Sequence, residues 1–586
     1  MRLRLAFAVA VALVSPACAV AALNTTTANE SSPPAIDSLT SSQIDDLVLL
    51  GKIWGFAKYH HPSITSGGTD WDSELLSILP VVLKASGRAA TTTAISNWLA
   101  RLDTPAACGP CAKIPEDLNL RPQLDWIRDQ RALGNTLSMQ LRRIYDNRRV
   151  TYAQQYVSFG AGVGNAVFAN EKAYAEKGFP DTGLRLLALY RFWNIVEYWS
   201  PYLDLVQGNW DTALREFVPR VWMSDNSDAY HLAMITLIAR VQDGHANLWS
   251  SLDVRPPRGL YRLPVIVRFI EGKAVVTGFS HDAFGPATGL RVGDVILSIG
   301  GARINSLIAA WAPYYAASNQ SARLRDMARS VTQGPPGRVR VTGERGSSTF
   351  ELQPERVSIS NLDRMAGSTN DLPGETFQLL TADVAYLKLS SVKAAQCSEY
   401  IRKAAGAKVL VIDIRNYPSE FVVFALGSHL VSQTTEFARF TRAEGTNPGA
   451  FLFTPPIALR PAPPFFDGSV VILVDESSQS QAEYTAMAFR VAPHVLVAGS
   501  TTAGADGNVS PIMLPGGLRT MISGLGVFYP DRRPTQQVGV VPDLVVRPTI
   551  AGIRQGRDEV LEAAVSRALG REFRLPQRAE SAKPKR

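Results

Sequence analysis

The sequence predicts a multidomain α/β protein, and three patterns that follow one another along its 586 residues indicate this class. A duplicated helical segment is followed by short alternating β runs, and then by apolar strands that alternate with helices. Strands that alternate with helices predict a largely parallel sheet covered on its faces. A chain of this length, with 46% hydrophobic and 19% charged residues, is expected to fold into several packed units.

The net charge of +8 would suggest a nucleic-acid partner if it were spread over the fold. Much of it is instead concentrated in Arg2 and Arg4 and in a basic tail over residues 571–586. We therefore expect no nucleic-acid partner.

Residues 1–22 have the pattern of a cleaved secretory signal peptide, and residues 23–42 have the composition of a Ser/Thr/Pro-rich linker. The apolar run that follows Arg4 is too short to span a membrane, and small residues at 19–21 offer a cleavage site. We therefore expect a periplasmic or secreted protein without stable membrane insertion. A lipoprotein acylated at Cys18 is a less favoured alternative, because Ser15-Pro16-Ala17 is a poor approach to that residue.

Cys108 and Cys111 are separated only by Gly and Pro, and in an exported protein this pair predicts a small structural disulfide. A redox motif would need a strand before the pair and a helix N-terminus after it, to lower the pKa of a thiol. Pro105 and Pro115 flank the pair and no β-rich run precedes it, so the redox alternative is weaker, and a zinc site is weaker still.

An internal repeat defines two helical segments, residues 43–165 and 166–258. The Trp-rich motif at 54–62, with Trp-Asp at 71–72, recurs at 193–201 with Trp-Asp at 210–211. Each copy predicts a helix, a loop and a second helix that starts at Trp-Asp, so we expect paired helical hairpins with the tryptophans in their core. His60 and His61 are expected in core or loop positions, because the second copy has Trp and Ser in their place.

Short β runs, a Gly-Asp turn and an expected helix over 304–317 make residues 259–357 a small barrel-like domain. The stretch Gly-Leu-Arg-Val-Gly-Asp-Val-Ile-Leu-Ser-Ile-Gly-Gly at 289–301 resembles part of a PDZ domain. This resemblance implies a module that captures an extended peptide, or its terminal carboxylate, at a sheet edge. The alternative is a spacer that binds nothing.

Residues 358–570 contain the expected α/β domain, whose chemistry would lie at the carboxyl ends of parallel strands. Apolar strands are expected at 384–389, 409–414, 470–474 and 495–499, and helices at 398–405, 421–431 and 482–491.

Ser480 lies in the turn Asp-Glu-Ser-Ser-Gln-Ser-Gln-Ala-Glu, residues 475–483, between an apolar strand and an apolar helix. A serine at a helix start has its hydroxyl near free backbone N–H groups, which can stabilise an oxyanion. The same Ser-x-x-Glu spacing is also a capping box, in which Ser480 and Glu483 bond each other's amides. From these residues alone, nucleophile and helix cap are equally good interpretations.

The strand, the serine cluster and Glu483 resemble the active-site segment of the carboxyl-terminal processing (tail-specific) serine peptidases. Segments at 289–301, 411–419, 502–508 and 539–543 fall in that family's order. The resemblance covers roughly residues 243–569, and it implies a PDZ domain, a following α/β peptidase domain and Ser480 as nucleophile. Many members pair the serine with a later lysine, but Ala505 and Asp506 stand where that lysine is expected.

Another base must therefore take the proton of Ser480, because a serine hydroxyl alone is a weak nucleophile. His245, in Gln-Asp-Gly-His-Ala-Asn at 242–247, matches the histidine of the branch that resembles the tricorn core protease, which lies ahead of the PDZ domain. His429 is the main rival, because it belongs to the predicted catalytic domain.

A third residue should hold the imidazole in its productive tautomer. In the tricorn-like branch an acid comes from near the Gly-Val-x-Pro-Asp stretch, where this chain has Gln536 and Gln537. We favour Asp506, because its Gly-rich turn should border the nucleophile. The full set of acidic candidates is Asp506, Glu483, Asp243 and Asp543.

The resemblance places the oxyanion hole at the backbone N–H of Gln481, with a second donor in the loop Asn-Tyr-Pro-Ser-Glu at 416–420. Pro418 has no N–H, so Ser419 or Glu420 must supply that donor, and Ser419 is our prediction.

These residues predict an exported serine-type endopeptidase that hydrolyses peptide or protein substrates through an acyl-enzyme, without a cofactor or a metal. The main alternative is a catalytically inactive homologue that binds a peptide or an apolar ligand. The missing lysine, the Gln536-Gln537 pair and the altered loop at 416–420 favour this alternative. Hydrolysis of a small ester by Ser480 is a third interpretation.

Overall fold

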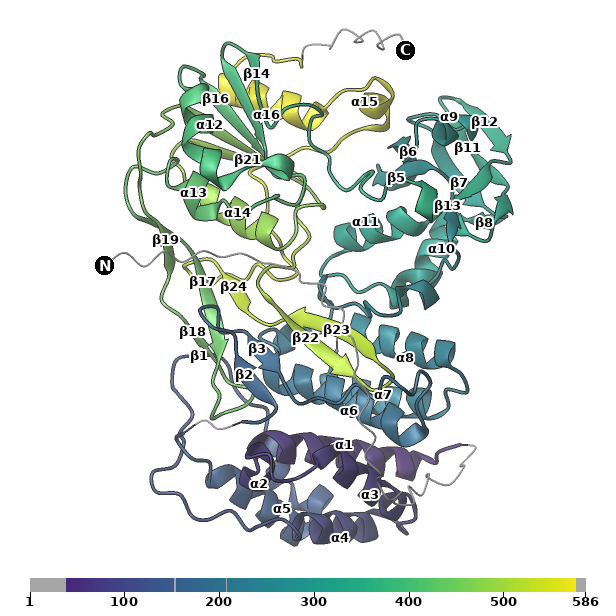
Figure 1. Cartoon of the computed structure of the whole chain (residues 1–586), viewed down its shortest axis with the longest axis vertical. Helices are drawn as coiled ribbons and strands as arrows, with labels where there is room; N and C mark the ends of the chain where they lie inside the picture. Colours follow the sequence, from purple (N-terminus) through teal and green to yellow (C-terminus); the bar gives the residue numbers. More distant parts are fainter. Residues whose placement is uncertain (1–37, 152–153, 207, 576–586) are drawn as a thin grey trace, which may run out of the picture.

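The computed structural model describes residues 38–151, 154–206 and 208–575 (Figure 1). Helices α1 to α8 gather at one end of the molecule, and an α/β unit forms the other end. A β-rich unit of residues 261–358, called the middle unit below, lies beside the α/β unit. The predicted signal peptide, Cys18, residues 23–37 of the predicted linker and residues 576–586 of the predicted basic tail lie outside the described residues.

The two sequence repeats form two matching helix pairs. The indole nitrogens of Trp54 and Trp71 each donate to the other residue's carbonyl, at 3.0 and 2.9 Å. Trp193 and Trp210 repeat this exchange, at 2.9 and 3.0 Å. All four tryptophans are buried, so the prediction of a core role is confirmed. The helices of this region are α1 (Ser41–His60), α2 (Pro62–Thr65), α3 (Trp71–Leu83), α4 (Arg88–Leu99), α5 (Gln130–Asp146), α6 (Thr182–Trp199), α7 (Trp210–Trp222) and α8 (Ser227–Ala239).

His60 and His61 are buried in this helical region. Burial lowers the pKa of His60 to about 3 and that of His61 to about 4, so both rings are neutral near pH 7. The predicted core or loop positions of the two histidines are confirmed, with His60 at the end of α1 and His61 between α1 and α2.

A buried cluster of charges joins the two helix pairs. The Arg191 guanidinium pairs with Glu171 and with Asp72, both at 2.8 Å, and Lys58 pairs with Glu171 at 2.6 Å. Arg191 and Lys58 are completely buried. The charges are therefore balanced inside the core, where an unpaired ion would be costly.

The middle unit is built on a sheet whose strands run in the order β12-β11-β7-β6-β5, with β8 paired to β7. β5 is an edge strand of this sheet, and helix α11 packs against it. The predicted helix at 304–317 is shorter, since α10 ends at Trp311 and a 3-10 turn follows. The strands are β4 (Tyr261–Arg262), β5 (Val265–Ile270), β6 (Lys273–Phe279), β7 (Val295–Ile299), β8 (Ala302–Arg303), β9 (Gln333–Gly334), β10 (Gly337–Arg338), β11 (Val341–Arg345), β12 (Ser348–Leu352) and β13 (Glu355–Ser358), and the helices are α9 (Phe284–Ala287), α10 (Ile304–Trp311) and α11 (Gln320–Ser330).

The C-terminal unit has a sheet in the order β14-β15-β16-β20-β21-β25. Neighbouring strands pair in parallel along the row β15, β16, β20, β21 and β25, and β14 is antiparallel to β15. The expected helix at 421–431 ends early, at Gly427, and His429 beyond it bonds backbone carbonyls instead. The elements are β14 (Phe377–Thr381), β15 (Val384–Lys388), α12 (Cys397–Ala404), β16 (Val409–Asp413), α13 (Val423–Gly427), β20 (Ser469–Val474), α14 (Gln481–Phe489), β21 (Val495–Gly499), β25 (Leu544–Val545), α15 (Ile550–Arg554) and α16 (Glu559–Leu569).

Two arms of the C-terminal unit reach the helical region (Figure 1). In one arm β17 pairs with β18, and β18 pairs with β1 of the N-terminal part. The other arm is the β22–β23 hairpin, which lies against α6 and whose apolar side chains belong to the helical core. The remaining strands are β1 (Leu118–Leu120), β2 (Val157–Phe159), β3 (Ala166–Phe168), β17 (Thr435–Ala443), β18 (Phe451–Phe453), β19 (Ile457–Leu459), β22 (Val509–Leu514), β23 (Leu518–Ser523) and β24 (Gly526–Phe528).

Polar contacts fix the β22–β23 hairpin on the helical region. Arg191 of α6 donates to the carbonyl of Met513 at 3.0 Å, and the Tyr230 hydroxyl donates to the carbonyl of Pro515 at 3.1 Å. Asn165 donates to the carbonyl of Val509 at 3.0 Å. Arg191 thus belongs both to the buried charge cluster and to the hairpin contact.

Cys108 and Cys111 form a disulfide, which confirms that prediction, and Cys397 is free and buried. Within the described ranges, no helix has the length and apolar character needed to cross a bilayer.

We predict that Arg191→Met destabilises the protein by about 3 to 5 kcal/mol, because it leaves the buried Asp72 carboxylate without its cation and Glu171 with Lys58 alone. The matched control is Arg215→Met, because Arg215 pairs with Asp45 on the surface and such pairs contribute about 1 kcal/mol or less. Urea unfolding followed by tryptophan fluorescence measures both. Equal effects of the two substitutions would contradict the buried-cluster role.

Candidate active site

Ser480 occupies a strained position between β20 and α14. Its φ of 57° and ψ of −121° lie outside the regions that non-glycine residues normally adopt. Its amide donates to the Ala505 carbonyl at 2.8 Å and to the Glu483 carboxylate at 3.2 Å. The turn therefore holds Ser480 directly before the first residue of α14, Gln481.

Glu483 is a buried hub for the backbone around Ser480. Its carboxylate accepts from the Thr502 hydroxyl, from the amides of Gly504 and Ala505 at 2.7 and 3.0 Å, and from the Ser480 amide. Burial raises the pKa of Glu483, while these hydrogen bonds oppose the rise. With both oxygens engaged in this way, Glu483 holds the 502–505 loop against the start of α14.

His245 follows α8 and is buried with its Nδ1 anchored. Nδ1 lies 2.9 Å from the Ser523 hydroxyl oxygen and 3.5 Å from the Asp243 carboxylate. The Ser523 hydroxyl donates to Asp243 at 3.0 Å, and the Ser523 amide donates to Asp243 at 2.6 Å. Because the Ser523 proton goes to Asp243, the Ser523 oxygen is left to accept from Nδ1–H. This places the free lone pair of the imidazole on Nε2.

Asp243 is therefore the acid that contacts the imidazole. Burial alone would raise the pKa of its carboxyl, but the interactions with His245 and the Ser523 amide hold that pKa below its usual value. An ionised carboxylate beside Nδ1 favours the tautomer that has its proton on Nδ1 and its lone pair on Nε2.

The loop that carries His245 packs on the turn that carries Ser480. A Cβ built on Gly244 would lie 3.1 Å from the Ala505 Cβ and 3.4 Å from the Gln479 side-chain nitrogen. Glycine allows this close approach, because a side chain here would make a tight contact with Ala505. Within the described residues, no hydrogen bond joins the Ser480 hydroxyl to His245.

The middle unit contacts both the His245 loop and the segments around Ser480. The Gly244 amide donates to the Ser318 hydroxyl at 2.8 Å, and Asn319 donates to the Thr502 carbonyl at 2.8 Å. Arg325 of α11 donates to the Glu476 carbonyl at 2.7 Å and to the Gln479 side chain at 2.8 Å. The candidate site thus lies where all three units meet.

Asp506, the acid favoured from the sequence, differs from the expectation. It has no hydrogen bond to His245 among the described residues; one carboxyl oxygen accepts from the Gly507 amide and the other is buried without a partner. Burial and the neighbouring Glu483 carboxylate raise the pKa of Asp506 well above its usual value. A carboxyl that favours its neutral form here does not suit the role of stabilising an imidazolium.

Asp543 stabilises the sheet and is not part of the candidate site. Its carboxylate pairs with Arg490 and accepts from the Val497 amide of β21 at 3.0 Å. The rival base His429 is also engaged elsewhere, because Nδ1 lies 2.7 Å from the Ala462 carbonyl and Nε2 lies 3.2 Å from the Ser398 hydroxyl.

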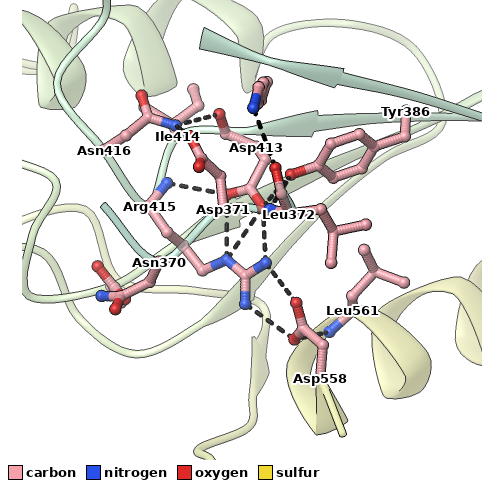
Figure 2. A network of polar contacts seen from close by, with 12 residues as sticks. Asn370, Asp371, Leu372, Tyr386, Asp413, Ile414, Arg415, Asn416, Asp558 and Leu561 are labelled. Carbon is pink, nitrogen blue, oxygen red and sulfur yellow. Dashed lines mark hydrogen bonds and ion pairs between the residues drawn. The ribbon is translucent and has the colours of Figure 1, made fainter. Parts of the chain in front are cut away.

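The loop after β16 borders Ser480, and a buried ion network anchors its beginning (Figure 2). Arg415 pairs with Asp413 at 2.6 Å and with Asp558 at 2.7 Å. The Tyr386 hydroxyl donates to Asp413 at 2.9 Å, and Asn416 donates to Asp371 at 2.8 Å. Figure 2 shows these side chains converging at the end of the strand that carries Asp413.

The predicted oxyanion donors have different outcomes. Gln481 begins α14, and its backbone N–H has no hydrogen-bond partner in the part of the chain that the structure describes. The Ser419 amide, by contrast, donates to the Leu389 carbonyl at 2.9 Å. Ser419 is therefore not a free donor in this conformation, because the loop packs its backbone against Leu389.

Sequence reasoning missed Ser523 and Tyr202. The Tyr202 hydroxyl accepts from the Val527 amide at 2.7 Å, and burial raises its pKa well above the usual value. No sequence pattern marks these residues, because Ser523 and Tyr202 reach the site only through the docking of separate units.

A family model and several solved structures match parts of the chain. Residues 383–546 match the family described as Peptidase family S41, and this segment includes Ser480 but not His245. The structure of mature CPAF complexed with lactacystin is 15% identical, with 64% of this chain and 95% of that chain covered and a TM-score of 0.51. No curated protein matches the chain.

Two further solved structures score lower. The photosystem II D1 C-terminal processing protease is 17% identical, with 62% of this chain and 92% of that chain covered and a TM-score of 0.38. The tricorn protease is 12% identical, with 66% of this chain and 37% of that chain covered and a TM-score of 0.33. The predicted resemblance is confirmed: the chain carries a peptidase family S41 domain.

We predict that Asp506→Asn changes the dependence of stability on pH. The pKa of Asp506 is raised above the ordinary 3.8, so the folded protein keeps a proton that the unfolded chain releases as the pH rises. Stability due to this group is therefore lost with rising pH, by up to about 1.4 kcal/mol per pH unit. The free energy of unfolding, measured at pH 5 and pH 8, should fall less with pH in the variant than in the parent.

Asp558→Asn is the control of opposite sign. Burial would raise the pKa of Asp558, but Arg415 lowers it overall, so this carboxylate stabilises the fold above the ordinary pKa and loses that contribution as the pH falls. If both variants shifted the pH profile in the same direction, the assigned protonation of Asp506 would be wrong.

Proposed function

We propose that the protein is an exported serine-type endopeptidase that hydrolyses peptide bonds through an acyl-enzyme, with Ser480 as nucleophile and His245 as general base. The observation that carries the proposal is the anchored imidazole: Nδ1 is held by Ser523 and Asp243, on a loop that packs against the turn of Ser480. The peptidase family S41 domain and the fold shared with CPAF support it.

The proposed reaction uses the lone pair of His245 Nε2. Nε2 takes the Ser480 hydroxyl proton while Oγ bonds to the substrate carbonyl carbon, and the imidazolium then gives that proton to the leaving amine. Water hydrolyses the resulting ester by the same two proton transfers. Asp243 stabilises the imidazolium formed in each half, through the charge that it keeps beside Nδ1.

Closure of the site belongs to this proposal, because Ser480 and His245 are not hydrogen-bonded in the structure. Catalytic hydrogen bonds are often longer without substrate and shorten in the substrate complex. The packing of Gly244 on Gln479 and Ala505 already holds the His245 loop against the Ser480 turn.

For the middle unit we propose a PDZ-like role, the capture of an extended peptide by the free edge of β5. Its support is the edge position of β5 with α11 packed beside it, since peptides add to such edges as a further strand. Arg325 of α11 contacts Gln479, so a peptide bound there would lie close to the nucleophile turn.

Export to the periplasm or the medium completes the proposal. Its support from the described residues is the Cys108–Cys111 disulfide, because such bonds persist in oxidising compartments.

The second candidate is an inactive homologue that binds a peptide or an apolar ligand in the same place. The absence of a Ser480–His245 hydrogen bond among the described residues favours it. So does Asp506, whose pKa is raised by burial and by Glu483, in the place where many relatives are expected to have lysine. Reactivity of Ser480 separates the two candidates.

We predict that a fluorophosphonate probe labels the purified protein at pH 8, and that Ser480→Ala abolishes the labelling. His245→Ala should slow labelling about 10²- to 10⁴-fold, because general-base help is lost. Asp243→Asn should slow it by at least about tenfold, because the tautomer is no longer fixed. Rates of labelling measured by in-gel fluorescence, with circular dichroism for folding, test all three.

The matched controls are Ser477→Ala, in the same turn, and His281→Ala, in the middle unit. Both should be labelled like the parent protein. A folded parent that remains unlabelled would favour the binding protein, and undiminished labelling of His245→Ala would remove His245 from the mechanism.

A further inference from the structure

Helix α11 and the two residues before it contact both the loop of the proposed base and the loop beside the nucleophile. The Ser318 hydroxyl accepts from the Gly244 amide at 2.8 Å, directly before His245 in the chain. The side chain of Asn319, the N-cap of α11, donates to the Thr502 carbonyl at 2.8 Å. The start of α11 is thereby bonded to both loops.

Arg325, further along α11, holds the turn that leads to Ser480. Its guanidinium donates to the Glu476 carbonyl at 2.7 Å and to the side-chain oxygen of Gln479 at 2.8 Å. The Asp326 carboxylate accepts from the same guanidinium at 2.9 and 3.1 Å, and such a two-point contact fixes the plane of the group. One side chain of the middle unit therefore holds the turn at Glu476 and at Gln479, which directly precedes the nucleophile.

A second arginine of the middle unit contacts the same turn. Arg268 of β5 donates to one oxygen of the Glu476 carboxylate at 2.8 Å, and the Ser500 hydroxyl donates to the other at 3.3 Å. Burial would raise the pKa of Glu476, but Arg268 lowers it overall, so the carboxylate is ionised near pH 7. The side chains of Arg268, Glu476, Arg325 and Asp326 are between 11 and 20% exposed. These ion pairs are therefore better shielded from solvent than pairs on the open surface.

The middle unit is attached to the C-terminal unit at another place as well. Apolar side chains of the middle unit pack with Ile550 of α15 in one buried cluster. Arg554 of the same helix donates to the Gly293 carbonyl at 3.1 Å. Because these contacts do not involve Arg325, we expect the middle unit to stay docked when Arg325 is replaced.

We infer that Arg325 is a positioning residue for the proposed reaction, and that with Ser318 it sets the separation of Ser480 and His245. This inference rests on the proposed function. The nucleophile and the base come from different units and do not bond each other in the part of the chain that the structure describes. Their separation is therefore set by the contacts around them, and α11 with its preceding residues holds both. A displacement of about 1 Å between reacting groups can slow a reaction about 100-fold.

The test is Arg325→Met, which keeps a long side chain and removes its hydrogen-bond donors. We expect kcat on quenched fluorescent casein to fall about 10- to 100-fold with KM changed less than about threefold, because substrate binding is kept and the attack is slower. Labelling by the fluorophosphonate, which needs no bound peptide, should slow by a similar factor. Arg325→Lys should recover part of the loss, because its ammonium group can restore one of the two hydrogen bonds to the turn.

The matched control is Arg329→Met, on the same helix. Arg329 pairs with Asp326 at 3.3 Å and, among the described residues, has no hydrogen bond to the turn at 475–480. This variant should keep kcat within about twofold. Ser318→Ala frees the loop of the base, and combining it with Arg325→Met should cost less than the product of the two single losses, because both alter the same separation.

Circular dichroism reports whether each variant folds. If Arg325→Met does not fold, Gln479→Met takes its place, because it removes the acceptor beside the nucleophile and leaves the ion pairs of Arg325 and Glu476 intact. The same loss of kcat is expected from it, and an unchanged kcat in the folded Gln479→Met protein would overturn the inference.

The remaining outcomes separate this inference from the proposed function. If the parent cleaves casein and folded Arg325→Met keeps kcat within about threefold, the inference is overturned while the peptidase remains. An equal loss in Arg329→Met, or a rise in KM alone, would also overturn it, because the effect would then reflect the charge of α11 or substrate binding. Fully multiplicative losses would remove Ser318 from the inference. A parent that neither cleaves casein nor reacts with the fluorophosphonate would overturn both.

Discussion

The docking of the β22–β23 hairpin on the helical region is the contact on which the candidate site depends. The hairpin starts soon after the 502–508 turn beside Ser480 and ends at Ser523, which bonds His245. Its apolar side chains complete the helical core, and Arg191 fixes its far end at Met513. The same element thus fixes the helical region to the C-terminal unit and orients the imidazole.

Three sets of contacts fix the residues of the candidate site. Glu483 fixes the backbone around Ser480, the Arg415 network fixes the neighbouring loop, and Asp243 with Ser523 fixes the imidazole. Each restraint is built on a buried carboxylate that accepts hydrogen bonds or pairs with a cation. Such satisfied networks hold side chains in one arrangement, which catalysis by preorganised groups requires.

Much of the fold and part of the site could be predicted from local sequence. The tryptophan pairs, the strands of the C-terminal unit and the strand–turn–helix around Ser480 all follow from short-range patterns, and the structure has them near the expected positions. The acid beside His245 could not be chosen in this way. Asp243 and Asp506 are both plausible in sequence, and only the Ser523 contact, 278 residues from His245, distinguishes them. Ser419 failed as a donor because its amide bonds Leu389, a tertiary contact without a sequence signal.

The division of the site among three units also governs when it can form. His245 and Asp243 lie on a segment that is synthesised long before the Ser480 turn, and they meet it only after the hairpin has docked. Contacts between such distant segments form late in folding, because long loops must close first. A nascent or half-folded chain would therefore carry the nucleophile and the base without being able to combine them. On the proposed function, activity would appear only once the three units have assembled.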